Sequence, residues 1–177
     1  MGTVRPGAVM MGAPVPPAAG RLPGWELRLA EALEEARQRP FAWGSHDCVS
    51  WAAAVRRRLT GRSTPWSGRW RTRLGAARVL RRSGHRDLAD AVRAALGEPL
   101  PTVRLAGRGD VVLIETGDLT RAAAGDLTGD ATALTTALTT GIAGQALGIC
   151  IGAEGAFVAP RGLIRRRMGD CALAWRI

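Results

Sequence analysis

The stretch FAWGSHDCVSW, residues 41–51, sets the pattern for the rest of the chain. Its Trp-Gly-Ser segment is typical of a turn, and Asp47, which follows, is a favoured residue at a helix N-cap. From Cys48 onward, apolar residues recur with helical spacing, at positions 48, 51, 55 and 59. The sequence therefore predicts a turn that leads into a buried helix, with Cys48 in the first turn of that helix.

Three residues of this stretch are candidates for catalysis: Cys48, His46 and Asp47. A helix start has unpaired N–H groups and the positive end of the helix dipole, and both favour a thiolate. His46 precedes the thiol by two residues, and a thiol with a nearby imidazole is half of a cysteine-nucleophile site. The simpler alternative is a small buried Cys in a helix with a loop His nearby by chance. The stretch alone leaves both interpretations open.

Helices dominate the first half of the sequence. The helix that starts at Cys48 is expected to close near Gly61, and apolar spacing predicts three others, over residues 24–38, 72–83 and 87–96. Thr72 is expected to cap the helix over 72–83, which should bury Leu74, Ala77 and Leu80.

The second half changes to an apolar period of two residues, which is typical of strands. A short buried strand is expected at 111–114, and others around 147–151, 157–158, 163–164 and 171–177. Four or five short strands at this spacing predict an antiparallel sheet. Helices followed by strands make the predicted fold class α+β, with the Cys48 helix packed on a C-terminal antiparallel sheet.

The domain plan is an extended arm at 1–20 and a single domain over 21–177 with an insertion at 117–144. The arm is rich in Gly, Pro and Ala without a period, and a translation start at Met10 or Met11 is another account of it. The insertion is unusually long for a connection inside a domain, and we interpret it as a projecting hairpin or a short helix. Both segments are expected to contact other subunits, although a flexible loop is the simpler reading of the insertion.

Composition argues against several classes of protein. No apolar run is long enough to span a bilayer, and the N-terminus lacks the apolar centre of a signal peptide. Three Cys without a CxxC pair predict neither a disulfide framework nor a zinc site, so no metal or cofactor is expected.

All 25 basic residues are Arg, and Lys, Asn and Tyr are absent, which indicates a GC-rich genome. Much of the net charge of +10 therefore has an explanation in codon usage. A basic patch nevertheless runs from Arg56 to Arg86, with Trp66 and Trp70 between its arginines. It could contact phosphates or an acidic protein, and a solvated face is the simpler reading. No nucleic-acid-binding motif accompanies it, so nucleic acid is not the expected partner.

Three stretches resemble NlpC-type bacterial cell-wall endopeptidases, which have a papain-like fold. WGSHDC at 43–48 is similar to their nucleophile signature, RGDVV at 108–112 to the start of their first strand, and ALGICIG at 146–152 to their His-bearing strand. More closely, residues 21–177 resemble short proteins from tail gene clusters of phages and gene transfer agents of GC-rich bacteria. That group shares the segments LPGWE, RPFAWGSHDC, RWRTR, DLAD and AWR.

This resemblance implies a virion protein at the tail tip, made in the cytoplasm of its host, with hub, distal tail and tip or fibre proteins as partners and peptidoglycan as a substrate if it is active. In the peptidases, a strand His is the general base, and the matching position here is Ala146. The residue matching the polar group that orients this His is Ala159. Residues 87–177 contain no His, so a base must come from His46 or His85, or the standard mechanism is absent.

Three functions follow as hypotheses. The first is a structural tail-tip protein with an NlpC-like domain and degraded catalysis. The second is a Cys48-dependent peptidase or amidase that opens peptidoglycan during penetration. The third and weaker one is a nucleic-acid-binding protein that acts through the Arg patch.

Overall fold

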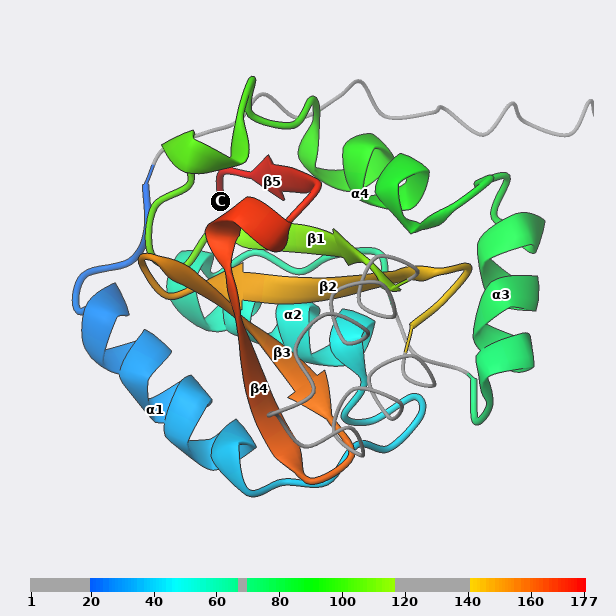
Figure 1. Cartoon of the computed structure of the whole chain (residues 1–177), viewed down its shortest axis with the longest axis horizontal. Coiled ribbons are helices and arrows are strands. Elements are labelled where there is room, and N and C mark those ends of the chain that lie inside the picture. Colours follow the sequence, from blue (N-terminus) through cyan, green and yellow to red (C-terminus); the bar gives the residue numbers. More distant parts are fainter. Residues whose placement is uncertain (1–19, 67–69, 117–140) are drawn as a thin grey trace, which may run out of the picture.

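Helices come first and strands second in the computed structural model, which describes residues 20–66, 70–116 and 141–177 (Figure 1). The helices are α1 (Trp25–Arg37), α2 (Cys48–Thr60), α3 (Arg73–Arg82) and α4 (Leu88–Leu96), with short 3-10 helices η1 (Val103–Leu105) and η2 (Met168–Asp170). The strands are β1 (Val111–Glu115), β2 (Gln145–Cys150), β3 (Glu154–Ala159), β4 (Gly162–Arg167) and β5 (Leu173–Trp175). The predicted α+β class is confirmed.

Side-chain caps explain where three of these helices begin, and the caps at Asp47 and Thr72 confirm the prediction. Asp47 caps α2 by accepting a hydrogen bond from Ser50 N–H, Thr72 caps α3, and Asp87 caps α4. Gly61 ends α2 in the left-handed region, at φ 71°, which glycine adopts without a steric penalty. Local capping chemistry is therefore sufficient to place these ends.

The described strands form one antiparallel sheet in the order β4-β3-β2-β1-β5. β1 and β2 pair from Val111↔Ile149 to Glu115↔Gln145, so the strands that flank the expected insertion are direct neighbours. The expected arm at 1–20 and insertion at 117–144 lie almost wholly outside the described residues. The last strand, β5, pairs with β1 and not with β4, so the C-terminal end of the chain crosses to the opposite edge of the sheet.

The last strand is shorter than its alternating pattern predicts. Only Leu173–Trp175 pairs with β1, whereas alternation runs from 171 to 177. The preceding residues form η2, and the N–H of Ile177 turns to the Asp110 carboxylate, at 3.4 Å, instead of continuing the ladder. The expected strand over 171–177 is therefore wrong at both ends.

Helices α1 and α2 pack on each other and on the sheet, with α2 against β2 and β3 and α1 against β4. Figure 1 shows α2 behind the sheet. α4 also contacts the sheet, because the backbone N–H of Ala89 in α4 donates a hydrogen bond to the side chain of Gln145 in β2. The packing of the Cys48-bearing helix on the antiparallel sheet confirms the predicted architecture.

The buried side of α3 differs from the expectation. Leu74 is 60% exposed, and Ala76 is buried in its place. Of the three residues expected inside, Ala77 and Leu80 pack against the core, together with Ala76 and Val79, and Leu74 alone is exposed. The apolar spacing of a helix does not fix the centre of its buried side, because the neighbouring elements determine it.

Close packing at Gly148 leads to a stability prediction. A Cβ at this position would lie 2.5 Å from both the carbonyl oxygen of Ala156 and the ring of Phe157. Gly148→Ala should therefore lower the free energy of unfolding by about 2 kcal/mol or more in urea denaturation, since backbone cannot move aside cheaply. Gly169→Ala, where a Cβ meets nothing within 4 Å, is the matched control and should change it by less than about 0.5 kcal/mol. Equal effects would mean that β2 and β3 are not packed as described.

Candidate functional site

The Asp47 carboxylate organises the turn before α2. It is completely buried and accepts three hydrogen bonds. Oδ1 accepts from Ser50 N–H at 2.8 Å, and Oδ2 accepts from Gly44 N–H at 2.6 Å and from Trp70 Nε1–H at 2.7 Å. One side chain thus ties together the turn, the first turn of α2 and the loop before α3.

The turn itself is closed by its own backbone. Ala42 and His46 form an isolated antiparallel bridge, with His46 N–H donating to Ala42 O at 2.8 Å and Ala42 N–H donating to His46 O at 3.0 Å. Gly44 lies inside this turn at φ 77°, where other residues are strained. The sequence WGS therefore fixes the direction in which the chain enters α2.

Cys48, the first residue of α2, lies against the sheet. Its side chain is buried, with 1% exposed, and the backbone N–H of Leu147 in β2 interacts with its sulfur. Burial, with a smaller contribution from the nearby Asp47 carboxylate, raises the pKa of the thiol to about 12, and the backbone N–H groups only partly oppose this rise. Desolvation thus outweighs the helix-terminal N–H groups, which favours the buried thiol over the thiolate at Cys48.

This pKa has a consequence for stability. The ordinary pKa of a cysteine thiol is 9.0, and that of folded Cys48 is about 12. Above the lower value an unfolded chain loses a proton that the folded chain keeps. The contribution of this thiol to stability is complete below pH 9 and falls as the pH rises toward 12.

Ala146, the position expected to match the peptidase general base, is the residue before Leu147, whose backbone interacts with the Cys48 sulfur. It lies in β2, pairs with Ile114 and is 6% exposed. A methyl group at this place neither accepts nor donates a proton. Ala159, the expected equivalent of the orienting residue, is buried at the end of β3 and pairs with Gly162.

His46 is buried, with 3% exposed, in the turn before Asp47. Its Nε2 atom has no hydrogen-bond partner among the described residues. Burial, together with the positive charge of Arg39, lowers the pKa of the imidazole, and Asp47 opposes this in part. His46 is therefore a neutral imidazole at neutral pH.

The second histidine has a different neighbour. His85 lies in the link between α3 and α4, with Nδ1 3.7 Å from Asp90 Oδ2. Asp90 belongs to the first turn of α4 and also accepts a hydrogen bond from Arg86 N–H. His85 therefore faces a carboxylate of α4 in a helix connection.

The other two thiols are also poor nucleophiles. Burial raises the pKa of Cys150, and it raises that of Cys171 to about 12. The three cysteines form no disulfide, and within the described ranges no cluster of three or more His, Cys, Asp or Glu residues could hold a metal ion. None of the described helices has the length and apolar content to cross a bilayer.

Two buried polar residues, Asp110 and Gln145, were not predicted from the sequence. Asp110, at the start of β1, is buried and pairs with Arg21 at 2.6 Å. The Gln145 side chain accepts from Ala89 N–H at 3.0 Å and donates to Glu115 at 2.8 Å, which links α4 to the sheet. An acidic residue between a glycine turn and an apolar run, RGDVV, was the only available signal, and Gln145 had none.

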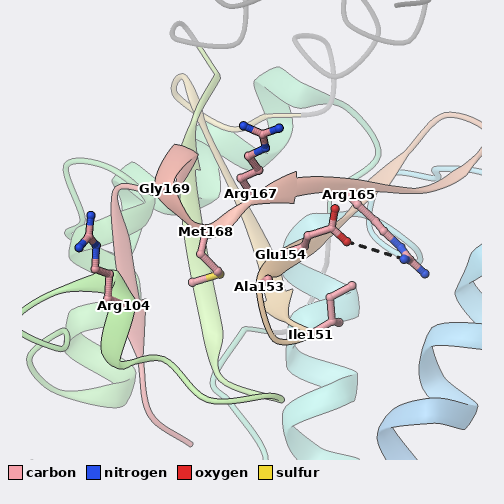
Figure 2. Close-up of a pocket in the computed structure, with 8 residues that line it drawn as sticks. All are labelled: Arg104, Ile151, Ala153, Glu154, Arg165, Arg167, Met168 and Gly169. Carbon is pink, nitrogen blue, oxygen red and sulfur yellow. Dashed lines mark ion pairs between the residues drawn. The ribbon is translucent and has the colours of Figure 1, made fainter.

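A shallow hollow of about 660 Å³ is a second candidate site (Figure 2). Its lining includes Arg104 of η1, Arg165 and Arg167 of β4, and Met168 of η2. Arg165 pairs with Glu154 at 3.7 Å, whereas no carboxylate of a described residue pairs with Arg104 or Arg167. The hollow could hold a small anion, but its arginines are exposed and it contains no nucleophile.

Residues 20–177 match a family model described as a domain of unknown function, DUF6950. The chain belongs to this family. No protein with curated annotation matches it. The family assignment covers the whole described domain, including the Asp47 turn, α2 and the sheet.

The Asp47 network leads to a second stability prediction. Asp47→Ala should lower the free energy of unfolding by about 3 kcal/mol or more, because it leaves Trp70 Nε1–H without its buried acceptor. Asp87→Ala removes the cap of α4, whose carboxylate accepts from Asp90 N–H, and should cost about 1 kcal/mol. Urea denaturation of both variants gives the comparison. Equal losses of unfolding free energy in the two variants would show that Asp47 contributes no more than an ordinary helix cap.

Proposed function

We propose that this DUF6950 protein is a structural component of the tail tip of a phage or phage-like particle. In this proposal its domain has an NlpC-like, papain-like plan with degraded catalysis. The observation that carries the loss of catalysis is the state of Cys48, which is buried, protonated and next to Ala146.

Cysteine-dependent hydrolysis needs a thiolate, a proton carrier for the leaving group and donors for the oxyanion. The start of α2 supplies backbone N–H groups, which are suitable donors. The thiol has a pKa of about 12, and the strand position beside it is an alanine. General acid–base catalysis contributes roughly 10²–10⁴-fold, so its loss alone would leave weak activity.

The tail location rests on the resemblance of residues 21–177 to proteins from tail gene clusters. The partners in this proposal are hub, distal tail and tip or fibre proteins. The arm at 1–20 and the insertion at 117–144 are proposed to provide contacts with them. The protein would be made in the cytoplasm of a GC-rich bacterial host and carried in the virion.

One observation favours the alternative, a Cys48-dependent peptidase or amidase acting on peptidoglycan. The buried Nε2 of His46 lacks a partner among the described residues, two positions before the thiol. Buried polar atoms without partners are uncommon and cluster where they serve a function. A rearrangement that exposes Cys48 and turns His46 toward it would be needed for activity.

Muropeptide release tests the two functions against each other. Purified wild-type protein, Cys48→Ala, His46→Ala and the matched control Cys171→Ala should all release no more muropeptide from peptidoglycan than buffer does. Cys48→Ala particles should also assemble, and antibody labelling should place the chain at the tail tip. Release by wild type that is abolished by both Cys48→Ala and His46→Ala, but retained by Cys171→Ala, would establish the peptidase. Absence of the chain from purified particles would refute the tail-tip role.

A further inference from the structure

Positive charge is segregated along this chain. Residues 48–86 contain 11 of the 25 arginines and none of the 15 acidic residues. The remaining 14 arginines nearly balance all 15 carboxylates. Codon usage in a GC-rich genome explains why the basic residues are Arg. It acts on the whole chain, however, and does not explain why positive and negative residues lie in separate parts of the sequence.

Within this stretch, the arginines of α2 are partly used by the fold. Arg58 forms a two-pronged ion pair with Glu35 of α1, at 2.9 and 2.7 Å. Arg56 is half-buried and donates to the carbonyl oxygens of Arg62 and Ser63. These contacts involve two of the three arginines of α2, and Arg57, the third, is exposed.

The arginines of α3 are all exposed, and no carboxylate of a described residue pairs with them; they are Arg73, Arg78, Arg81 and Arg82. Figure 1 shows α3 at the margin of the molecule, away from the sheet. Leu74, Arg78, Arg81 and Arg82 follow the spacing i, i+4, i+7, i+8, which places them on one side of the helix. We call these four residues the α3 basic face.

The stability of α3 does not explain this face. Arg78 lies three and four residues before Arg81 and Arg82, and like charges at this spacing repel each other. Arg73 lies at the positive end of the helix dipole, which is also unfavourable. Only Arg81 and Arg82, in the last turn, gain from the dipole. A negatively charged partner would remove the repulsion that the isolated helix retains.

We propose that the α3 basic face docks on an acidic protein surface that also offers an apolar pocket for Leu74. The positive charge of this face favours an acidic partner. Leu74, which is 60% exposed among the arginines, favours a protein over a nucleic acid, because the outer surface of a nucleic acid presents phosphates and no apolar pocket. Trp70 cannot stack on bases because it is buried and bonded to Asp47. This inference is independent of whether Cys48 is catalytic.

The test uses three defined probes: poly-L-glutamate, a Glu/Tyr copolymer of equal charge and a short double-stranded DNA. Binding to the full chain is measured by fluorescence anisotropy at about 50 and 200 mM salt. Wild type should prefer the Glu/Tyr copolymer to both other probes. Leu74→Ser should reduce its affinity for the copolymer about fivefold to tenfold, to the level of poly-L-glutamate, because the apolar contact is lost.

Charge is tested by a matched pair of triple variants. The variant R78Q/R81Q/R82Q should bind both acidic polymers at least about tenfold more weakly, as expected for several lost charge pairs. The control R104Q/R165Q/R167Q removes the same formal charge from the hollow of Figure 2 and should stay within about twofold of wild type. Thermal unfolding checks that all variants are folded.

Three results would overturn the proposal. Tighter binding of DNA than of the acidic polymers would make the face a nucleic-acid contact. Equal losses in the two triple variants would show that net charge alone drives binding. Unchanged binding of the Glu/Tyr copolymer by Leu74→Ser would show that Leu74 makes no apolar contact with the partner.

Discussion

The buried carboxylate of Asp47 is the constraint on which the rest of the domain depends. Burying a carboxylate costs several kcal/mol unless hydrogen bonds compensate, and here three N–H donors surround it. Those donors come from the turn, from α2 and from Trp70, so the carboxylate is stable only when all three segments are assembled. The start of α2, with Cys48 as its first residue, is thereby tied to the turn and to the loop before α3, while the packing of α2 on β2 places the thiol against the sheet.

The same packing separates geometry from chemistry at Cys48. A thiol at a helix start, next to a strand, is the arrangement from which cysteine nucleophiles are built. In this chain the approach to β2 is so close that the thiol is desolvated, and the neighbouring strand residue is Ala146. A helix dipole acts over one turn and is modest in size, so it does not offset complete burial. The arrangement therefore provides packing at the start of α2 and favours the protonated thiol.

The sequence was sufficient for features that depend on local chemistry. Caps at Asp47 and Thr72 were predicted correctly because neighbouring residues determine them. Features that depend on distant residues were missed or wrong. Trp70 reaches Asp47 across 23 positions, Leu74 is exposed because the packing of α3 centres its buried side on Ala76, and the pKa of Cys48 depends on burial against a strand almost 100 residues away.

Titration of Cys48 shows whether this residue is a protonated, buried thiol or an activated one. The ¹³Cβ resonance of Cys48, assigned by its loss in Cys48→Ala, can be followed by NMR in the folded protein from about pH 7 to about pH 11. We expect no ionisation shift of this resonance below about pH 10, since burial keeps the thiol protonated. Ionisation below about pH 8 would contradict it and would show an activated cysteine.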